Sequence, residues 1–364
     1  MMKTKFQSRV IFRLAGTKVI CAIPLLLLSL AAHSAHAATL PGIPEFIDEM
    51  VAKHHFKRTE LESVFTHAQH LPGIIEIISR PATTKPWLEY RAAFVNAERI
   101  KFGLKFWDKY RQALQSAERK YGVPQEIILA VIGVETVYGQ DKGTFRTLDA
   151  LTTLAFDYPR RAVFFRSELE NYLLLAREQQ LDLLAIRGSY AGALGIPQFM
   201  PSSYRNYAVD FNGNHKIDLL NEAKDAIGSV ANYLQGYGWD TGIPPKNSLP
   251  GTRKTGDSLP RGGAQLKQPI AVPALVGENN SVGETAATRT LMAWAEAGVV
   301  PGENIAHDET ARLIDFTLAE GKEFWLVFNN FEVITRYNNS DFYAMTVFQL
   351  AEALKQARST SAAK

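Results

Sequence analysis

Cysteine is almost absent from this sequence: among its 364 residues, only Cys21 carries a thiol. Cys21 lies in an N-terminal stretch that we expect to be removed, so the remaining chain offers neither a disulfide nor a thiolate metal site. The sequence also lacks an H-E-x-x-H pattern, and His54 and His55 are more typical of a solvated helix face than of a zinc site. These absences argue against a disulfide-stapled fold and against the common zinc hydrolases.

Acidic residues are absent from the first 37 positions, which carry five basic ones. An apolar stretch from Val19 to Ala32 leads to Ala35-His36-Ala37, the small-residue pattern of a signal-peptide cleavage site. The stretch is short for a transmembrane helix, although an uncleaved membrane anchor is the alternative. We predict a cleaved bacterial-type signal peptide at residues 1–37 and a periplasmic mature protein. Because Cys21 lies at the start of the apolar stretch and not behind it, a lipoprotein is not expected.

Charge of one sign does not dominate the rest of the chain. The formal net charge is +3 for the whole sequence and −2 once the five basic residues of the N-terminal stretch are removed. No long Lys/Arg block is present, so the charge pattern indicates no nucleic-acid partner. The 327 residues after position 37 are enough for one large core or for two to three smaller ones. We expect a monomer.

Apolar periodicity predicts a mainly helical chain. Helices are expected between residues 44 and 121, notably over 96–121, and then over 124–139, 162–179, 222–234 and 341–357. Pro124 is placed to open one of these helices, and Asn338-Asn339-Ser340 offers an N-cap cluster for the last. Between Thr252 and Glu323, Gly, Pro, Thr and Val become frequent, and short runs at 269–272 and 324–327 are typical of strands.

These patterns predict a mainly α (α+β) fold with several parts. The expected division is a signal peptide at 1–37, an N-terminal helical domain at 38–118, a central core at 119–248, a small β-rich insertion at 249–327, a segment completing the core at 328–357 and a disordered tail at 358–364.

One carboxylate lies on the apolar side of the helix predicted over 124–139. Glu135 follows Ile132-Gly133-Val134 and shares a broad face with Val131 and Tyr138. Burial disfavours the charged form of a carboxyl group and raises its pKa, which suits a general acid working near neutral pH. The alternative is a Glu that turns out to solvent at the helix edge.

A dense motif occupies residues 188–204, with the sequence Gly-Ser-Tyr-Ala-Gly-Ala-Leu-Gly-Ile-Pro-Gln-Phe-Met-Pro-Ser-Ser-Tyr. Its small residues allow close approach of a ligand or of another strand. Ser189, Tyr190 and Gln198 carry hydroxyl and amide groups of the kind that bind sugar hydroxyls, and Phe199 offers a ring for stacking. The alternative is a tight Gly-rich turn held by its own hydrogen bonds.

Several motifs follow one another along the chain. They are Val-Glu-Thr-Val-Tyr-Gly at 134–139, Tyr-Pro-Arg-Arg at 158–161, the segment 188–204, Asp-Ala-Ile-Gly-Ser-Val-Ala-Asn-Tyr at 225–233 and Thr-Arg-Tyr-Asn at 335–338. Together they resemble the MltB-type lytic murein transglycosylases, glycoside hydrolase family 103, over about residues 42–355. The resemblance implies a lysozyme-like core that cuts the MurNAc-β-1,4-GlcNAc bond of peptidoglycan without water and leaves a 1,6-anhydro-MurNAc end. It also suggests other cell-wall synthesis or division proteins as partners.

The resemblance assigns roles to single residues. It implies that Glu135 is the catalytic glutamate and that Arg160 and Arg161 meet carboxylates of peptide stems. The residues that it places in the substrate cleft are Ser189, Gln198, Phe199, Tyr233, Tyr337, Asn338 and Tyr343. Phe164, which we include among the substrate residues, stands where some relatives have Tyr. Ile196-Pro197 stands where others have Tyr-Gly, so the cleft wall is expected to differ there.

The number of carboxylates fits this reaction. Most glycosidases use two, whereas the motifs supply only Glu135; Asp149 and Asp157 are near in sequence, but no motif makes either a second catalytic group. A single acid suffices if the C6 hydroxyl of the sugar replaces water as the nucleophile, and the chemistry then requires no cofactor. The alternatives are a hydrolytic muramidase on the same scaffold and a non-catalytic peptidoglycan-binding scaffold.

The segment 210–218 resembles the start of a calcium-binding EF-hand loop. Positions 1, 3, 5 and 7 offer three side-chain oxygens and one main-chain carbonyl, from Asp210, Asn212, Asn214 and Lys216. Some relatives in the family bind Ca²⁺ there with a later aspartate that falls on Asp225. Here His215 replaces the usual Gly at position 6, and one residue is inserted before Asp225. A structural Ca²⁺ and an Asx-rich loop held by its own turns are equally weighted alternatives.

Overall fold

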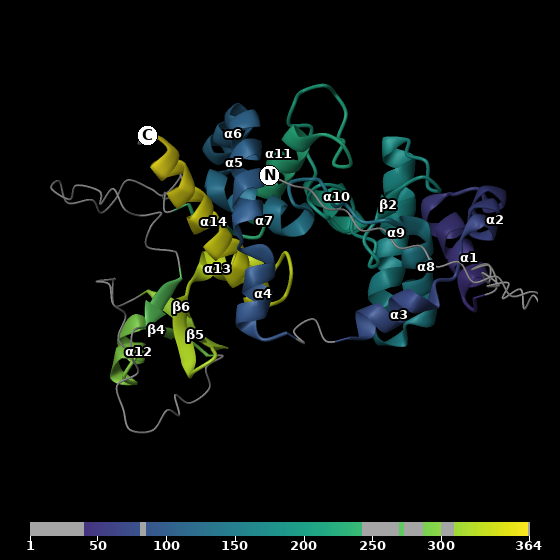
Figure 1. The fold of residues 1–364 in the computed structure, drawn as a ribbon. Coiled ribbons are helices and arrows are strands. Elements are labelled where there is room, and N and C mark those ends of the chain that lie inside the picture. The colour runs from purple at the N-terminus through teal and green to yellow at the C-terminus, as the bar shows by residue number, and fades with distance from the viewer. Residues whose placement is uncertain (1–39, 81–84, 242–268, 273–286, 300–308, 363–364) are drawn as a thin grey trace, which may run out of the picture. The chain divides into compact units, whose positions relative to one another are not determined.

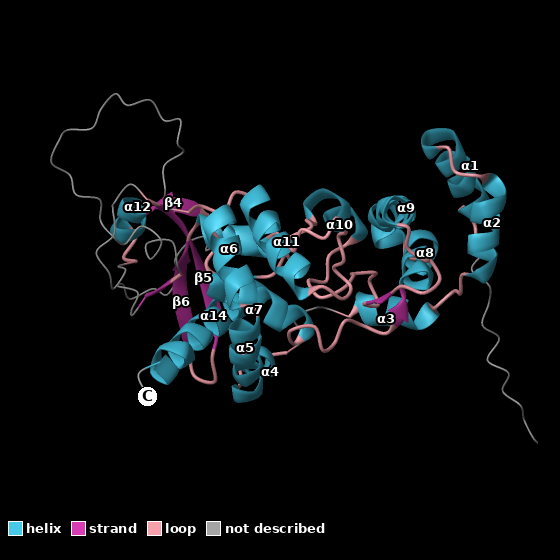
Figure 2. Cartoon of the chain, turned by 90° about the horizontal axis from the view of Figure 1, so that it is seen from above, coloured by secondary structure: helices cyan, strands magenta, loops and turns pink. Residues whose placement is uncertain are grey.

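The computed structural model describes residues 40–80, 85–241, 269–272, 287–299 and 309–362. These residues lie in one unit, Ser34–Lys364. The predicted signal peptide lies outside the described residues, as does the part of the β-rich insertion before residue 269. Helices account for most of the ordered elements, and Figure 2 shows few strands among them. The mainly α fold predicted from the sequence is therefore confirmed.

One group of helices joins the N-terminal end of the described chain to residues 147–179. It consists of α1 (Ile43–His54), α2 (Arg58–His67), α3 (Pro72–Ser79), α8 (Thr147–Asp157) and α9 (Ala162–Gln179) (Figure 1). The helices α8 and α9 pack along each other, and α3 packs on α8. Phe46 from α1 packs edge-on against Phe65 of α2 and Phe156 of α8, with ring centroids 6.0 and 5.7 Å away. The N-terminal helices therefore share their core with helices from the middle of the chain.

A second group of helices surrounds the helix that carries Glu135. It consists of α4 (Trp87–Phe94), α5 (Ala97–Lys109), α6 (Arg111–Tyr121), α7 (Gln125–Thr136), α11 (Ala223–Gly236), α13 (Asn329–Thr335) and α14 (Asp341–Ala362). The central helix is α7, because α5, α6, α11 and α14 all pack on it. Its residues from Ile127 to Val134 are all buried, as a run apolar on every side requires.

The strands form a small antiparallel sheet and a short ribbon. The sheet has the order β3 (Ile270–Val272), β6 (Lys322–Val327), β5 (Thr310–Thr317) and β4 (Thr288–Thr290), and the ribbon pairs β1 (Phe145–Arg146) with β2 (Arg187–Gly188). Trp294 of α12 (Leu291–Glu296) is fully buried among sheet residues such as Leu313 and Leu326. The sheet therefore has its own small hydrophobic cluster, and the strands predicted at 269–272 and 324–327 are present as β3 and β6.

An arginine connects the sheet to the helices. Arg312 of β5 donates to Glu332 Oε1 of α13 at 2.8 Å and, with two nitrogens, to both oxygens of Asp341 at 2.9 and 2.7 Å. Such bidentate pairing of an arginine with a carboxylate is among the stronger ionic contacts in proteins. It fixes the start of α14 relative to the sheet.

The helix boundaries differ from the prediction in three places. The helix predicted over 96–121 is two helices, α5 and α6, because the backbone leaves the helical region at Tyr110. The α7 helix ends at Thr136, before Gly139. The α14 helix continues to Ala362, so the disordered tail predicted at 358–364 is wrong for residues 358–362. The other domain boundaries stay predictions, since one hydrophobic cluster extends from Ile43 to Leu354.

Within the described ranges, no helix is both long enough and apolar enough to cross a membrane.

Candidate active site

Glu135 lies in the last turn of α7, where it is only partly exposed to solvent. The hydroxyl of Tyr343, from α14, donates a hydrogen bond to Glu135 Oε1 at 2.6 Å. Burial raises the pKa of Glu135 to about 7, and the hydrogen bond from Tyr343 lowers it in part. The side chain therefore holds its proton near neutral pH, as a general acid must.

A strained turn fixes the end of the helix next to Glu135. Val137 and Tyr138 have φ of 50° and 61°, in the left-handed region that β-branched and bulky residues rarely adopt. The buried hydroxyl of Thr136 donates to the carbonyl of Ile196 at 2.7 Å and accepts from the N–H of Gly139 at 2.9 Å. These contacts hold the turn in place and attach the end of α7 to the segment 188–204.

Tyrosine rings extend away from the Glu135 carboxylate. Tyr337 stacks on Tyr343 at 6.3 Å between centroids, and Tyr233 of α11 lies 4.8 Å from Tyr337. The hydroxyls of these two residues donate to main-chain carbonyls, from Tyr337 to Pro197 at 2.5 Å and from Tyr233 to Arg336 at 2.6 Å. The structure thus brings together three of the tyrosines predicted for the cleft, although they lie far apart in the sequence.

Phe199 does not provide the open stacking face predicted for it. Its side chain is only 2% exposed, and its ring packs against Tyr233 and Tyr337 at 5.4 and 5.8 Å. Burial on that scale leaves no face for a sugar. Phe199 supports the tyrosines from behind, and the prediction of a direct sugar contact is corrected accordingly.

The segment 188–204 is largely a turn held by its own hydrogen bonds. Ser189 Oγ accepts from the N–H groups of Ala191 and Ala193 at 3.2 and 3.0 Å. The amide nitrogen of Gln198 donates to the carbonyls of Gly195 and Lys142 at 2.8 and 3.2 Å. The two predicted polar side chains thus shape the loop, while the ring of Tyr190 is 36% exposed.

The predicted arginines lie at the start of α9. Arg160 and Arg161 end a short 3₁₀ turn, Pro159–Arg161, and both are exposed. The guanidinium of Arg161 lies 4.3 Å above the centre of the Phe164 ring, and Val163 beside it is 86% exposed. Two exposed cationic side chains and two exposed apolar side chains thus lie close together on this part of the surface. Asn338, the last predicted cleft residue, is exposed in the loop before α14.

Tyr90 of α4 is a neighbour of Glu135 that the sequence did not reveal. Burial raises the pKa of the Tyr90 hydroxyl, and the charge of Glu135 raises it further. The pKa of the Tyr343 hydroxyl is raised in the same way, mainly by burial and further by the charges of Glu135 and Tyr90. Tyr90 lies outside every motif, so only the three-dimensional packing could have identified it.

The two carboxylates considered from the sequence, Asp149 and Asp157, have structural partners. Asp149 is 4% exposed and accepts from Arg146 at 2.7 and 2.8 Å and from the N–H of Gln69 at 2.9 Å. Asp157 is bonded to the ring of His70 at 2.7 Å. Among the described residues, none of the charges that shift the pKa of Glu135 comes from a second carboxylate.

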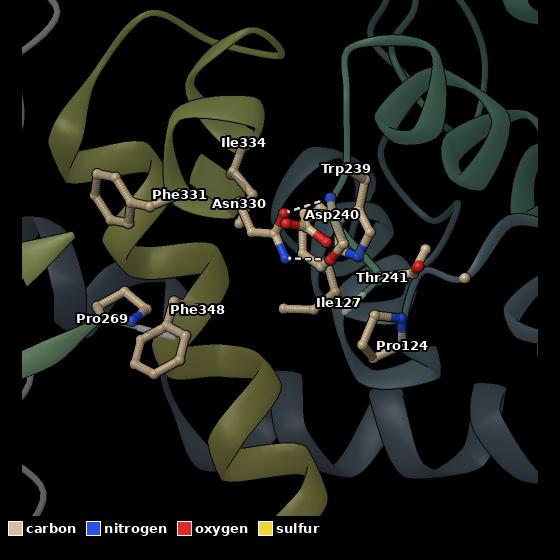
Figure 3. A pocket seen from close by; sticks show the side chains of 11 residues that line it. Pro124, Ile127, Trp239, Asp240, Thr241, Pro269, Asn330, Phe331, Ile334 and Phe348 are labelled. Atoms are coloured by element: carbon tan, nitrogen blue, oxygen red, sulfur yellow. Dashed lines mark hydrogen bonds between the residues drawn. The ribbon is translucent and has the colours of Figure 1, made fainter. Parts of the chain in front are cut away.

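The small cavity shown in Figure 3 lies elsewhere. It has a volume of about 40 Å³, which suits one or two water molecules, and Ile127 of α7 and Phe348 of α14 line it. Asn330 closes it by exchanging hydrogen bonds with the main chain of Asp240, at 2.7 and 2.9 Å. Ile127 precedes Glu135 by two helical turns, so this cavity belongs to the packing between α7, α13 and α14.

The loop at 210–218 has the hydrogen-bond pattern of a cation-binding turn. Asp210 accepts from the N–H groups of Gly213, Asn214 and His215 at 2.7, 3.1 and 2.7 Å. Asp225, which is fully buried in α11, accepts from Phe211, Asn212 and Asp218 at 2.9, 3.3 and 3.0 Å. His215 takes φ of 66°, so it adopts the conformation for which glycine is usual at position 6.

The two carboxylates at this loop, Asp210 and Asp225, affect each other electrostatically. Burial raises the pKa of Asp225, its three N–H donors lower it, and the charge of Asp210 raises it again. Within the described ranges, neither carboxylate forms an ion pair, and no cluster of three or more His, Cys, Asp or Glu side chains occurs. Two acidic and two amide side chains with oxygen donors are what a hard divalent cation such as Ca²⁺ binds.

Comparison with known proteins identifies relatives of this chain. The family model described as the transglycosylase SLT domain matches residues 40–352. Membrane-bound lytic murein transglycosylase B of Escherichia coli is 40% identical over 335 residues, which are 88% of this chain and 84% of that protein. The structure of the Escherichia coli lytic transglycosylase SLT35 in complex with calcium superposes with a TM-score of 0.75 at 39% identity, covering 88% of this chain and 94% of the other.

A further relative was solved with a peptidoglycan fragment. The structure of SltB3 from Pseudomonas aeruginosa in complex with NAG-anhNAM-pentapeptide has a TM-score of 0.71 at 28% identity, covering 86% of this chain and 78% of the other. The similarity of fold and sequence thus extends over nearly all of the described chain.

Proposed function

Because this chain belongs to the family of the transglycosylase SLT domain and is a lytic transglycosylase acting on peptidoglycan, we propose that Glu135 alone performs both proton transfers of the reaction. The observation that carries the proposal is a partly buried glutamate with a pKa of about 7 and no second carboxylate that affects it among the described residues. Such a residue can begin as an acid and end as a base without assistance from another charge.

Each step can be written with its protons accounted for. Glu135 donates its proton to the glycosidic oxygen, and the bond from C1 of MurNAc to that oxygen breaks. The C6 hydroxyl of the same MurNAc then bonds to C1, and the Glu135 carboxylate takes the proton that the hydroxyl loses. Glu135 is thereby restored, no water is consumed, and the sugar ends as 1,6-anhydro-MurNAc. Tyr343 contributes by holding one carboxylate oxygen, so that the other can reach the substrate.

The substrate residues are proposed from their positions. Of the row Tyr343, Tyr337 and Tyr233, only Tyr337 is partly exposed and can offer its ring to the substrate, while Tyr343 and Tyr233, at 2% and 5% exposure, support it from the core. Tyr190 and Asn338 are exposed enough to meet a glycan. Ser189 and Gln198 shape the wall through their loop hydrogen bonds. We place the peptide stem near Arg160 and Arg161, where Val163 and Phe164 add apolar surface for its side chains and the guanidinium groups can pair with its carboxylates.

The proposed reaction is tested by weighing its products. Purified sacculi digested with the enzyme are expected to release muropeptides whose MurNAc ends weigh one water less than reducing ends. A hydrolytic muramidase would release reducing ends, and their predominance in the mass spectrum would contradict the proposal. A non-catalytic binding protein would release neither.

We also propose that the 210–218 loop binds Ca²⁺, in line with the calcium complex of SLT35. The groups that would hold the ion are the side chains of Asp210, Asn212, Asn214 and Asp225 and the carbonyl of Lys216. A bound divalent cation would neutralise Asp210 and Asp225, which affect each other, since the charge of Asp210 raises the pKa of Asp225. The ion would connect this loop to the helix that carries Tyr233, which is a structural and not a catalytic contribution.

Calcium is expected to raise the melting temperature. An ion that binds only the native state increases the free energy of unfolding by about 2.7 kcal/mol at a hundredfold excess over Kd. Asp210→Ala should abolish that increase, whereas Glu76→Ala, which removes an exposed carboxylate from α3, should retain it. Melting curves measured with millimolar calcium and with a chelator provide the measurement. If the unmodified protein gave identical melting curves with calcium and with the chelator, the loop would not bind calcium, and His215 and the inserted residue would be the reason.

For localisation we propose a periplasmic protein released from its signal peptide after Ala37. The basic, acid-free start of the chain and the Ala35-His36-Ala37 pattern support this proposal. The relative from Escherichia coli is named membrane-bound, and here Cys21 is poorly placed for a lipid. N-terminal sequencing of the exported protein should begin at Ala38; an uncleaved chain or a lipid on Cys21 would overturn it.

A further inference from the structure

A groove with basic walls lies between α5 and the segments around Lys142 and Asn221. It consists of two adjoining hollows of about 340 and 390 Å³ that share Lys142 and Asn221, and we call it the α5 groove. Tyr138 and Gly139, from the turn after Glu135, form part of its wall, but neither Glu135 nor any of the tyrosines beside it does. The α5 groove therefore does not contain Glu135, although Gly195 and Ile196 of the segment 188–204 are among its lining residues.

Three lysines form a row along α5, and two of them, Lys105 and Lys109, line the groove. Lys101, Lys105 and Lys109 are spaced by four residues, so they share one helix face at intervals of about 6 Å, and all three are exposed. Like charges at this spacing repel and weaken a helix. Among the described residues, no acidic side chain pairs with any of the three, and the nearby Asp108 is bonded to Arg111 at 2.8 Å. The row therefore presents a line of exposed positive charge along this face of α5.

Two further cations line the groove beyond α5. Lys142 donates to the carbonyl of Leu220 at 2.7 Å, which holds its charge at the point where the two hollows meet. Arg187 uses one nitrogen for the carbonyl of Thr144 at 2.7 Å. The one acidic residue in the lining is Asp182, whose Oδ1 accepts from the N–H of Leu184 at 2.8 Å. The lining is thus strongly positive, in a chain whose net charge after residue 37 is −2.

The floor between these cations is aromatic. Phe102, Phe106 and Tyr110 line the groove beneath the lysine row, and the ammonium of Lys109 lies 4.9 Å from the centre of the Tyr110 ring. A concave, aromatic floor with a cationic rim fits a narrow chain that carries both apolar groups and negative charges. An anionic membrane surface is flat and would contact the rim only.

We propose that the α5 groove binds the carboxylate-bearing stem peptides of peptidoglycan, at a site distinct from the one at Glu135. The proposal rests on peptidoglycan being the substrate, because stem peptides are the part of that polymer that combines carboxylates with apolar side chains. Lys105, Lys109, Lys142 and Arg187 pair with the carboxylates, while the aromatic floor receives the side chains. The enzyme thereby holds a second stem, or a neighbouring strand, while a glycan is cut.

The test reverses charge on the row while leaving the proposed catalytic residues intact. Lys105→Glu combined with Lys109→Glu is compared with Lys57→Glu combined with Lys85→Glu, which changes the net charge equally at exposed lysines just before α2 and just before α4. Lys105→Gln with Lys109→Gln is a milder version that keeps good helix formers. Each pair is also made in a Glu135→Gln background, so that binding can be measured without digestion. Melting curves confirm that each variant is folded.

Binding is measured by co-sedimentation with intact sacculi and with sacculi from which an amidase has removed the stems. The groove variant is expected to bind intact sacculi at least about tenfold more weakly, with a shallower salt dependence, while its binding and cleavage of stem-free glycan match those of the unmodified enzyme. The Gln pair should show a smaller loss and the control pair none. The proposal would be overturned if the groove variant bound intact sacculi as tightly as the unmodified enzyme does. It would also be overturned if the variant lost binding only to vesicles of anionic phospholipid, measured by the same co-sedimentation. These outcomes do not depend on the chemistry at Glu135, which product masses test separately.

Discussion

Glu135→Gln is expected to lower the rate of glycan cleavage by about a thousandfold or more while leaving the fold and glycan binding intact. The amide has nearly the shape of the carboxylic acid and can still accept the hydrogen bond that Tyr343 now donates. It cannot release a proton to the glycosidic oxygen or take one from the C6 hydroxyl. General acid–base catalysis contributes about 10² to 10⁴ to a rate, and here one residue supplies both transfers. The rate of sacculus solubilisation, with binding measured on the same preparation, checks the result.

A matched variant tests whether one carboxylate is sufficient. Asp157→Asn removes a carboxylate near Glu135 in sequence, whose partner is the ring of His70 at 2.7 Å. We expect it to change the cleavage rate by no more than a few fold. A loss of activity as large as that of Glu135→Gln would mean that a second carboxylate takes part in the reaction. That result would favour the alternative of a hydrolytic muramidase.

Much of the site was predictable because its residues belong to short motifs with chemical meaning. An ionisable residue in an otherwise apolar helix, Glu135, could be singled out from the sequence, and its raised pKa agrees with the burial inferred there. The helices over 162–179 and 222–234 were predictable from periodicity. The N-cap predicted at Asn338-Asn339-Ser340 is present, because Ser340 Oγ accepts from the N–H of Tyr343 at 3.4 Å. Tyr343 was placed in the cleft only by the family resemblance. Its bond to Glu135 spans 208 positions and could not be read from spacing.

Other features depend on packing that no local pattern encodes. The break at Tyr110 occurs where the sequence has no Gly or Pro, between residues 104 and 121, so periodicity favoured one long helix. Phe199 was assigned a sugar contact because aromatic rings bind sugars. An aromatic ring is equally suited to the hydrophobic core, and in the structure the ring of Phe199 is buried there. The left-handed conformation of Val137 opposes the preference of a β-branched residue and exists because Thr136 and the surrounding contacts hold it. Tyr90 reaches Glu135 from a helix that precedes α7 by more than thirty residues.

The acidity of Glu135 should also be visible in the stability of the protein. Its pKa is about 7 when folded and near its ordinary value of 4.5 when the chain unfolds. Between these values the folded state binds more protons than the unfolded state, so the free energy of unfolding falls as pH rises. The contribution is fully present below pH 4.5 and is lost as pH rises through 7, with a total of roughly 3 kcal/mol. Glu135→Gln has no proton to lose there, so its stability relative to the unmodified protein should improve by that amount between pH 4.5 and 8.

Melting temperatures and denaturant unfolding of both proteins, measured across this pH range, provide the comparison. Other titrating groups affect both proteins alike, so the difference between the two curves isolates Glu135. Glu320→Gln is the control, because it makes the same chemical change at a glutamate that is exposed in the turn between β5 and β6. If the curves for Glu135→Gln and the unmodified protein stay parallel from pH 4.5 to 8, then Glu135 titrates as an ordinary surface carboxylate. In that case it would be ionised at neutral pH and unable to act as the acid, whatever its position in the motif.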